Sequence, residues 1–412
     1  MPLFWLGTVI HLCMPQVLNL FHLPLEFTIK FNCVPSGPLA AARRFDADTR
    51  PMLERLTPPC PLSPYLEDRP LPFVVNTRSL NASRHAGVQR YVSNLLRALP
   101  GPVKTLSSRP AAGLAEAQLW EQVILPTQLR GRLLFSPANS GPVRLRRQVV
   151  TVHDVATLDH PEWFAGRFAA WYRWMLPRLI ASAQHVITVS NHSRDRILAL
   201  TDAAPDRVTA IPLGIEPAFR PADPAAVQAV KQRHAIDGRY ALVVGSIEPR
   251  KNLATLFRAW SGWIDRPDDL CLVVAGSAGH AFAGSGFGTP PPGCRLIGRV
   301  ADADLPALYS GATFFAFPSV YEGFGLPPLE AMACGTPVIV SNATSLPEVV
   351  GEAGLLLDPH DPQAWTQAMR HLIHDEAARR SLGAAGHAHA GRFSWHATAQ
   401  ATQSILEQEA AR

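Results

Sequence analysis

The segment Ser319-Val-Tyr-Glu-Gly-Phe-Gly-Leu-Pro-Pro-Leu-Glu330 follows an apolar run, 313–317, and leads into residues that favour a helix. Pro328 suits the first turn of that helix, where the N–H that proline lacks would have no partner anyway. Gly323 and Gly325 let backbone N–H groups approach a bound ligand, and the start of a helix attracts phosphate. The segment therefore predicts a strand, a ligand-binding loop and a helix in succession.

Two glutamates of this segment stand eight residues apart, Glu322 before the glycines and Glu330 in the early turns of the helix. A carboxylate accepts hydrogen bonds from two neighbouring hydroxyls of a sugar. One glutamate would then hold a ribose and the other a second sugar. The residues alone leave another interpretation open, in which Glu330 interacts with the helix dipole and Glu322 is a solvated loop residue.

Buried strands and helices alternate along the whole chain from Phe73 onward. Strands are predicted at 73–75, 133–135, 149–152, 186–189, 208–211, 240–244, 270–275, 313–317 and 337–340. Helices are predicted at 88–99, 164–182, 193–200, 252–260, 305–310 and 328–334. Such alternation indicates parallel sheets with right-handed crossovers. A stretch rich in proline and alanine, 217–226, splits the series into two doubly wound domains, and ligands bind at the carboxyl ends of such strands.

The expected organisation has four parts. We expect an extension and proline-rich linker over 1–72, a first Rossmann-like domain over 73–220, a second over 236–395, and a C-terminal helix over 396–412. Residues 1–25 contain no Asp, Glu, Lys or Arg and are long enough for a membrane anchor. Prolines and polar residues interrupt them, so a poorly ordered extension is favoured over an anchor.

Composition narrows the class of partner. The 412 residues carry a formal net charge of +5, far from the dense basic face of a nucleic-acid-binding protein. This mild excess suits anionic substrates or a position near anionic lipid. Six cysteines without a C-x-x-C pair suggest a reducing compartment, so we expect a cytoplasmic enzyme, peripheral at most to the inner face of the membrane. Aromatic residues at 171–174, flanked by arginines, favour helical core packing over membrane contact.

Two further strand ends carry candidate chemistry. The segment Val243-Val-Gly-Ser-Ile-Glu-Pro-Arg-Lys-Asn252 presents adjacent cations, Arg250 and Lys251, which suit a diphosphate. Val149-Val-Thr-Val-His-Asp154 ends in His153, which would contact the acceptor or the transferred group. The alternatives are a solvated turn at the cations, a core histidine bonded to backbone at His153, and an Asp154 that caps the next turn.

Two aspartates separated by one residue form a possible metal site. Asp302-Ala-Asp304 has the spacing of a metal-binding carboxylate pair, but it precedes a helix predicted to begin near Leu305. Aspartate is a preferred residue at the start of a helix, so capping is favoured and no metal site is predicted.

In this order and spacing, the three segments resemble the retaining glycosyltransferases of family 4. Those enzymes have the GT-B fold, an α/β architecture of two Rossmann-like doubly wound domains facing across a cleft. The resemblance covers about 73–400, and the following motifs carry it: Glu322 to Glu330 as E-x7-E, Ala331-Met-Ala-Cys-Gly-Thr-Pro-Val-Ile-Val340, Glu248-Pro-Arg-Lys-Asn252 and Ile211-Pro-Leu-Gly-Ile215. The first half is similar to bacterial mannosyltransferases of the lipopolysaccharide type, through Gly87-Val-Gln-Arg-Tyr91, Val152-His-Asp-Val-Ala156 and His160-Pro-Glu-Trp163.

The resemblance implies a role for each matching residue. Lys251, helped by Arg250, would bind the diphosphate, and Glu330 the ribose hydroxyls. The remaining positions lie around the transferred sugar, the phosphates and the base: Glu322 with the backbone of Gly323, Phe324, Gly325 and Leu326 at the sugar and its phosphate, His153 near the reacting centre, Gly87 near the donor phosphates, and the loop at Arg299 and Val300 around the base. Ser246 stands where many members have an arginine, so either Arg250 compensates or the phosphate contacts are weaker.

The implied reaction is transfer of a hexosyl group, mannose first among them, with retention of configuration. The donor would be a nucleotide-diphosphate sugar and the acceptor a glycan or lipid-linked sugar, with no metal or other cofactor and no nucleic-acid partner. Two alternatives stay open: a nucleotide-sugar epimerase of the same architecture, and a non-catalytic scaffold that binds sugar nucleotides. If Lys251 serves only the donor, Lys251→Ala should weaken diphosphate binding and barely move the unfolding midpoint.

Overall fold

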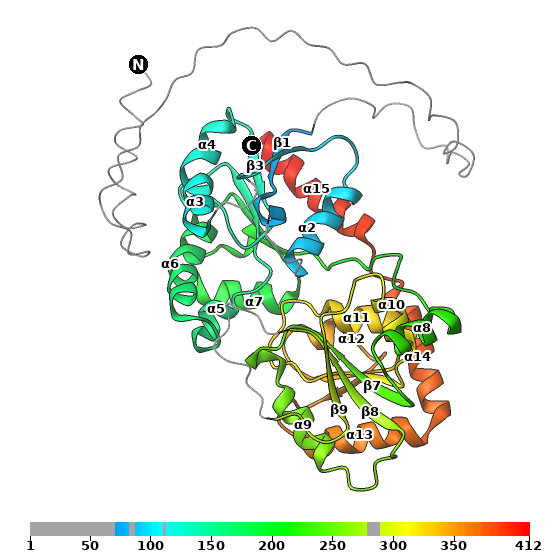
Figure 1. Cartoon of the computed structure of the whole chain (residues 1–412). Coiled ribbons are helices and arrows are strands. Elements are labelled where there is room, and N and C mark those ends of the chain that lie inside the picture. The colour runs from blue at the N-terminus through cyan, green and yellow to red at the C-terminus, as the bar shows by residue number, and fades with distance from the viewer. Residues whose placement is uncertain (1–70, 82–86, 110–112, 278–288) are drawn as a thin grey trace, which may run out of the picture. The chain divides into compact units, whose positions relative to one another are not determined.

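The protein is described here by a computed structural model that covers residues 71–81, 87–109, 113–277 and 289–412. Residues 70–412 form one compact unit. The extension and linker expected over 1–72 lie outside the described residues, apart from the last two positions. The unit contains two six-stranded sheets, each with its own helices (Figure 1).

The first sheet has all its strands parallel, in the order β2-β1-β3-β4-β5-β6. Its strands are β1 (Phe73–Asn76), β2 (Lys104–Leu106), β3 (Leu133–Ser136), β4 (Gln148–Thr151), β5 (His185–Thr188) and β6 (Val208–Ala210). The order reverses between β1 and β3, which places a crevice at the carboxyl ends of those strands.

The second sheet repeats this arrangement in the order β12-β11-β10-β7-β8-β9, again all parallel. Its strands are β7 (Arg239–Val244), β8 (Leu270–Ala275), β9 (Cys294–Gly298), β10 (Phe314–Phe317), β11 (Val338–Ser341) and β12 (Leu355–Leu357). Here the order reverses between β7 and β10. These are the strands that lead into the cation segment and the glycine loop, so both segments reach the same switch point.

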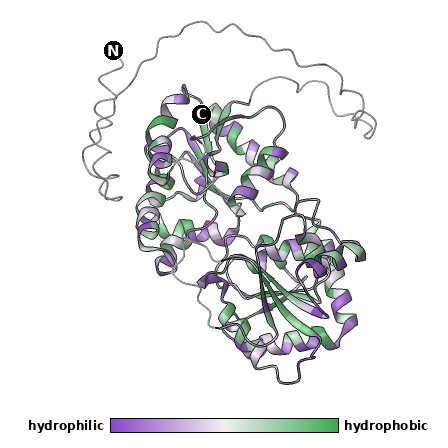
Figure 2. Ribbon diagram, viewed as in Figure 1, coloured by the Kyte–Doolittle hydropathy of each residue, from purple (hydrophilic) through white to green (hydrophobic). Residues whose placement is uncertain are grey.

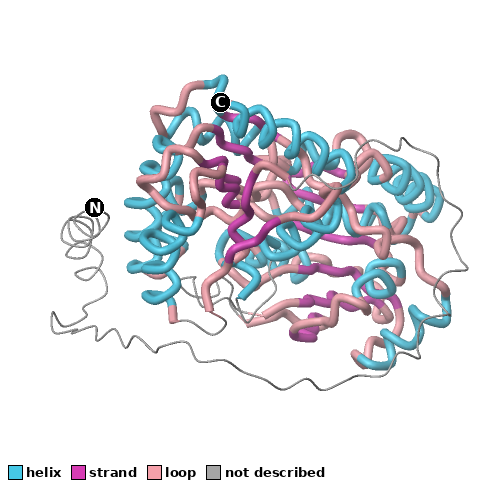
Figure 3. The backbone as a smooth tube through the Cα atoms, turned by 90° about the horizontal axis from the view of Figure 1, so that it is seen from above, coloured by secondary structure: helices cyan, strands magenta, loops and turns pink. Residues whose placement is uncertain are grey.

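Helices lie on both sides of the strands (Figure 3). Those of the first half are α2 (Gly87–Ala98), α3 (Leu114–Leu119), α4 (Leu125–Gln128), α5 (Ala156–Asp159), α6 (Gly166–Ser182) and α7 (Asn191–Leu200). Those of the second half are α8 (Pro224–Arg233), α9 (Leu253–Ser261), α10 (Leu305–Ser310), α11 (Leu326–Ala333), α12 (Leu346–Val350), α13 (Pro362–His374) and α14 (Glu376–Ala390). The last helix, α15 (Trp395–Ala411), packs on the first half. Together with the parallel strands these helices confirm the predicted GT-B arrangement.

Alternation along β7 explains how the second sheet is covered on both faces. Ala241 and Val243 pack with Trp260 of α9 and Trp365 of α13, both fully buried. Tyr240 and its neighbour Leu242 belong to the cluster on the other face. Burying such large apolar side chains contributes about 1.5–3 kcal/mol each. The strands of this sheet accordingly carry mostly the hydrophobic colour in Figure 2.

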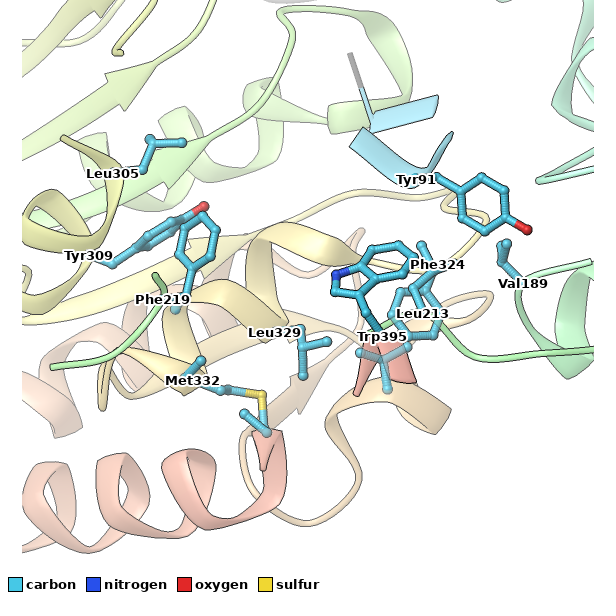
Figure 4. Packing of buried hydrophobic residues seen from close by; sticks show 14 of the residues in the cluster. Tyr91, Val189, Leu213, Phe219, Leu305, Tyr309, Phe324, Leu329, Met332 and Trp395 are labelled. Carbon is cyan, nitrogen blue, oxygen red and sulfur yellow. The ribbon is translucent and has the colours of Figure 1, made fainter. Parts of the chain in front are cut away.

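The cluster that contains Tyr240 and Leu242 continues toward the first sheet. In Figure 4, Phe219 and Tyr309 lie together, while Phe324 and Trp395 approach Tyr91. The Tyr91 and Trp395 rings are 6.0 Å apart between centroids, and those of Phe219 and Tyr309 are 6.1 Å apart. Apolar side chains from α2, from α10, from α15 and from the segment that joins the two halves therefore form one packed region.

The chain passes between the two sheets twice, and the two passages touch. Ile215 bridges to Ser394, and its N–H donates to the carbonyl of Phe393 at 3.2 Å. A Cβ on Gly214 would lie 2.1 Å from the backbone nitrogen of Trp395, so only glycine fits at this crossing. We call residues 211–223 the connector. After the crossing, α15 packs against α2, β1, β3 and β5 of the first half (Figure 1).

The structure differs from the sequence-based expectation at several boundaries. Helix α8 begins within the expected separating stretch, 217–226, and fills most of the gap left between the two expected domains. It packs on α10, so the second half begins at Pro224. Strands β2, β9 and β12 were not predicted, nor was the helical segment 114–128. These strands are short or sit at or near the ends of the sheets, with no fully buried residue in any of them. They therefore lack the apolar run on which a strand prediction depends.

The crossing predicts a stability effect at a single glycine. Gly214→Ala should lower the free energy of unfolding by about 1–3 kcal/mol, because the added methyl group overlaps the Trp395 backbone and one passage must shift. Gly166→Ala is the control, since a Cβ there meets nothing within 4 Å. Denaturant unfolding of both variants measures the effect. Equal stability of the two would mean that the crossing yields easily.

Candidate active site

The carboxyl ends of the strands border a cavity of about 530 Å³. It collects every residue that the sequence singled out for the site, from both halves of the chain. These residues are Gly87, His153, Ser246, Arg250, Lys251, Val300, Glu322, Gly323, Phe324, Gly325, Leu326 and Glu330. Segments as far apart as α2 and α11 thus meet at one place.

The glycine loop is shaped by two close approaches. Gly325 has φ +117°, and a Cβ there would lie 2.7 Å from a methyl carbon of Leu346. A Cβ on Gly323 would lie 2.6 Å from the carbonyl oxygen of His153. The Ser193 hydroxyl donates to that same carbonyl at 3.1 Å. The loop of the second half is thereby in direct contact with the end of β4, and a side chain at Gly323 would separate the two.

Glu322 is buried and bonded to both predicted cations. Lys251 Nζ lies 2.5 Å from Glu322 Oε1, and Arg250 Nη1 donates to Glu322 Oε2 at 3.1 Å. Burial would raise the pKa of Glu322, but the charges of Lys251 and Arg250 outweigh it, so the pKa lies below its ordinary value. Glu322 is therefore ionised and fixed, which excludes the interpretation as a solvated loop residue.

A second buried carboxylate, Glu248, stands on the other side of the arginine. Arg250 Nε is 2.7 Å from Glu248 Oε1, and Glu248 is 1% exposed. Burial raises the pKa of Glu248, and Arg250 and Lys251 oppose this only in part. The backbone at these cations is fixed as well, because the Arg250 carbonyl accepts from the Val320 N–H at 2.8 Å. The pair 250–251 is thus a built element of the site and not a solvated turn.

Glu330 occupies the second turn of α11 and is 2% exposed. Arg90 Nη1 donates to its Oε1 at 2.6 Å, and the Tyr309 hydroxyl donates to its Oε2 at 2.9 Å. Burial raises the pKa of Glu330, opposed by Arg90 and Tyr309. Glu330 therefore interacts with specific donors from α2 and α10, and not with the helix dipole as the alternative had it.

His153 lines the cavity and is also bonded to backbone. Its Nε2 is 3.0 Å from the carbonyl oxygen of Pro137, so Nε2 carries the proton and Nδ1 is the acceptor. Burial lowers the pKa of His153, which keeps the ring neutral at pH 7. Its ring meets that of Tyr91 edge-on at 4.6 Å. The next residue, Asp154, accepts from the Ala156 N–H at 3.1 Å, as the capping alternative proposed.

Several contacts in and around the site were not found from sequence. Arg90 and Tyr309 hold Glu330, and the Tyr321 hydroxyl donates to Asp159 at 2.9 Å across the cleft. Glu348 accepts from the Asn191 N–H at 3.0 Å at the start of α7. Arg90 and Tyr321 lie within motifs that the sequence had already marked. Their partners are far away along the chain, so local patterns carried no signal for these contacts.

The capping prediction at Asp304 is wrong. Asp304 precedes α10 but makes no side-chain hydrogen bond to its N–H groups, and it pairs with Arg233 of α8 instead. Asp302 lines the cavity. Among the described residues, no group of three or more His, Cys, Asp or Glu side chains could hold a metal ion.

The aromatic residues of α6 agree in part with the core-packing prediction. Trp171 is buried, while Trp174 is half-buried with the Arg178 guanidinium over its ring at 4.9 Å. In the ranges that the structure covers, no helix is both long and apolar enough to cross a membrane.

Charges in the cavity nearly balance. The cationic side chains that line it are Arg90, Arg250, Lys251 and Arg299, and the carboxylates are Asp154, Glu248, Asp302, Glu322 and Glu330. An anionic ligand would therefore be recognised by the direction of individual donors and not by a net positive field.

Two Rossmann-like halves that share a cavity lined by these paired carboxylates and cations define a glycosyltransferase of GT-B fold. Residues 238–375 match the family model described as glycosyl transferases group 1, and residues 132–219 match the model described as glycosyltransferase family 4. The chain is 37% identical over 270 residues to O-antigen chain mannosyltransferase B of Escherichia coli, covering 62% of this chain and 68% of that protein. The chain belongs to glycosyltransferase family 4.

Other relatives are much longer or more distant. The serotype-specific mannosyltransferase WbdA of Escherichia coli is 32% identical over 283 residues, covering 64% of this chain but only 33% of WbdA. Sucrose-phosphate synthase from Thermosynechococcus elongatus has the same fold, with a TM-score of 0.64 at 21% identity over 82% of this chain and 98% of that one. Anabaena Alr3699/HepE, in complex with UDP and glucose, gives 0.63 at 17% identity over 82% and 99%.

Pairing with Glu322 changes the expectation for Lys251→Ala. Removing Lys251 leaves a buried carboxylate with Arg250 alone, so we expect the free energy of unfolding to fall by about 2–4 kcal/mol at pH 7, and not to stay unchanged. Because the folded-state pKa of Glu322 is lowered, its stabilising contribution is present above the unfolded pKa and is lost as pH falls through the folded pKa. The difference between variant and parent should therefore shrink in acid.

Lys231→Ala is the matched control, because Lys231 donates only to the Gly238 carbonyl at the surface, at 2.7 Å. Denaturant unfolding at several pH values compares the three proteins. A Lys251→Ala variant as stable as Lys231→Ala would show that the pair with Glu322 contributes nothing.

Proposed function

We propose that the chain transfers a hexosyl group, with mannose as the leading candidate, from a nucleotide-diphosphate sugar to a glycan or lipid-linked acceptor, with retention of anomeric configuration. The observation that carries the proposal is one cavity in which buried Glu322 is paired with Lys251 and Arg250 and buried Glu330 is paired with Arg90. The printed names of the Escherichia coli relatives support mannose, and the HepE complex with UDP supports a nucleotide donor.

The donor diphosphate would lie against Lys251 and Arg250. Both cations are already ion-paired with carboxylates, so their positions are fixed before the ligand arrives. A fixed donor needs no reorganisation when charge develops on the leaving group. The N–H groups at the start of α11, freed by the turn at Gly325, would add partial positive charge at the same place.

The nucleoside would extend from there along the second half. Glu330 would accept from the ribose hydroxyls with the lone pairs that Arg90 and Tyr309 leave unused. The base would lie by Val300, which is buried in the same cavity beside Arg299.

The transferred sugar would lie between Glu322 and His153. Glu322 precedes Gly323, whose backbone touches the His153 carbonyl, so the two side chains flank the point where the halves meet. An ionised Glu322 would accept from sugar hydroxyls and would stabilise positive charge as the sugar becomes oxocarbenium-like. A neutral His153, whose Nε2 proton is directed at the Pro137 carbonyl, would accept a hydrogen bond at Nδ1 without adding charge at the reacting centre.

We also propose that the reaction needs no divalent ion, because Lys251 and Arg250 supply positive charge where the diphosphate leaves. A lipid-linked acceptor would bring the chain to an anionic membrane surface, where its mild positive net charge would assist.

Product analysis tests the proposal. The chain should release a nucleoside diphosphate from a nucleotide-activated hexose only when a glycan or lipid-linked acceptor is present, and NMR should find the donor's anomeric configuration in the product. EDTA should leave the rate unchanged. Release of an altered free nucleotide sugar would indicate an epimerase, an inverted product would contradict retention, and magnesium-restored activity after EDTA would contradict the metal-free proposal.

The two glutamates should respond differently to amide substitution. Glu330→Gln should raise KM for the donor and weaken binding of the free nucleoside diphosphate by roughly tenfold, because the ribose contact is the same in ground and transition states. Glu322→Gln should lower kcat by about 10²–10³. It should not weaken diphosphate binding, because Lys251 and Arg250 lose a competing anion.

Glu376→Gln provides the control, since Glu376 pairs only with Arg380 on the surface of α14. Steady-state kinetics and calorimetry with the nucleoside diphosphate measure both effects. If Glu322→Gln weakens diphosphate binding as much as Glu330→Gln does, the assignment of sugar to one glutamate and ribose to the other is mistaken.

A further inference from the structure

Arg90 connects three parts of the chain that are distant in sequence. It lies one turn into α2, its guanidinium lines the cavity, and it is ion-paired both with Glu330 of α11 and with Glu216 of the connector. The sequence motif around Gly87 contains Arg90 without assigning it a role, and the proposed function uses it only as the cation beside Glu330.

The contact with Glu330 is direct and well aligned. Arg90 Nη1 donates to Glu330 Oε1 at 2.6 Å, while the Tyr309 hydroxyl takes the other oxygen at 2.9 Å. One donor per oxygen fixes the plane of the carboxylate. Each oxygen keeps a further lone pair, so the carboxylate can still accept from two hydroxyls of a bound ligand.

The contact with Glu216 holds Arg90 in place from the opposite side. Arg90 Nη2 and Nε donate to the same Glu216 oxygen at 2.7 and 3.1 Å. The guanidinium also lies over the Phe219 ring, with Cζ 5.1 Å from the ring centre. Glu216 follows directly on Ile215, which bridges to Ser394 where the two passages between the halves touch. Arg90 is thus fixed to the connector, close to the point where the two passages between the halves touch.

The start of α2 lies within this same arrangement. Gly87 begins α2 and lines the cavity three residues before Arg90. Asn94 and Arg97 lie on the same face of α2, one and two turns further from the cavity than Arg90. The Asn94 side-chain oxygen accepts from Arg97 at 3.2 Å. Anchoring Arg90 therefore fixes the distance between the start of α2 and Glu330.

Removing the cation would leave Glu330 without its charged partner. Glu330 is 2% exposed, and burial already raises its pKa. The other titratable groups facing it are Tyr309 of α10, Glu216 of the connector and Cys334, which directly follows α11. None of these is a cation, so among the described residues Arg90 is the charge that favours the ionised carboxylate.

We propose that Arg90 is a positioning residue for the donor's ribose: it keeps the Glu330 carboxylate ionised and correctly oriented, and it ties that carboxylate to the connector and to the start of α2. The inference rests on the proposed function, because it takes Glu330 as the ribose-binding group. Arg90 acts through Glu330 and needs no contact with the reacting atoms.

Binding of three ligands to four proteins tests this proposal. The proteins are the full-length parent, Arg90→Gln, Arg90→Lys and Arg97→Gln. The ligands, measured by calorimetry, are whichever of guanosine or uridine diphosphate the parent binds, its 2′,3′-dideoxy counterpart, and pyrophosphate. Arg97→Gln is the matched control, since Arg97 lies on the same face of α2 without reaching Glu330.

Arg90→Gln should bind the nucleoside diphosphate roughly 10- to 100-fold more weakly than the parent at pH 7. The dideoxy compound lacks the hydroxyls that Glu330 would accept, so parent and Arg90→Gln should bind it equally. Pyrophosphate should likewise show no difference, and Arg97→Gln should match the parent throughout. These ligand-specific losses would not follow from a merely structural role, which would weaken all three ligands together.

The pH profile provides an independent readout. Loss of Arg90 raises the pKa of Glu330 further, and a protonated Glu330 accepts fewer hydrogen bonds. Nucleoside diphosphate affinity of Arg90→Gln should therefore fall, as the pH is lowered, at a higher pH than in the parent. Arg90→Lys keeps the charge and should keep the parent's midpoint, which also provides a folded variant should Arg90→Gln unfold.

The inference fails if Arg90→Gln binds the nucleoside diphosphate like the parent, if it loses the dideoxy compound to the same extent, or if Arg90→Lys shifts the pH midpoint as Arg90→Gln does. Failure of the proposed function would appear differently, as a parent protein that binds neither nucleoside diphosphate.

Discussion

Buried carboxylates impose the main constraint on this site. Glu322, Glu330 and Glu248 are each almost fully shielded from water, and an ionised carboxylate in such surroundings is strongly unfavourable without a cation and hydrogen bonds. The chain supplies the cations: Lys251 and Arg250 pair with Glu322, Arg250 also pairs with Glu248, and Arg90 pairs with Glu330. Arg250 and Lys251 are adjacent in one helical turn of the second half, whereas Arg90 lies in α2 of the first half, so the pair of Arg90 with Glu330 exists only when both halves are formed.

The same constraint explains how a cavity with balanced charge can bind an anion. A surplus of positive charge would attract any anion, and salt would screen it. Paired cations offer fixed N–H directions, which select ligands by shape and by the position of each oxygen. Selectivity for one sugar nucleotide would then depend on geometry more than on attraction, in agreement with a protein whose net charge is only +5.

How much of this was predictable depends on the distance along the chain between interacting residues. The central strands were predicted because each is a short, fully buried run, as in Phe314–Phe317. Three of the strands at the sheet ends, β2, β9 and β12, are partly exposed and showed no such run, as in Cys294–Gly298. Residues of the site were found where they share a local motif, as Glu322 and Glu330 do.

Their partners were not found, because the pairing of Arg90 with Glu330 spans 240 residues and leaves no local pattern. Asp304 shows the opposite failure: a strong local preference for capping was overridden by Arg233, which tertiary packing brought near. The structure therefore corrects the sequence-based interpretation mainly in the partner of each charged side chain. It changes much less the set of residues that form the site.

The position of α15 has a consequence for how the protein is made. This helix is the last element of the chain, yet it covers strands and a helix of the first half, and its Thr398 hydroxyl donates to the Pro212 carbonyl at 2.8 Å. A ribosome completes the first half's strands long before it adds this cover. During that interval the apolar surface beneath α15 lacks this helix, and exposed apolar surface favours aggregation. The second half, by contrast, buries its sheet with helices from its own stretch of sequence, so covering the first half depends on a segment that is synthesised after the second half.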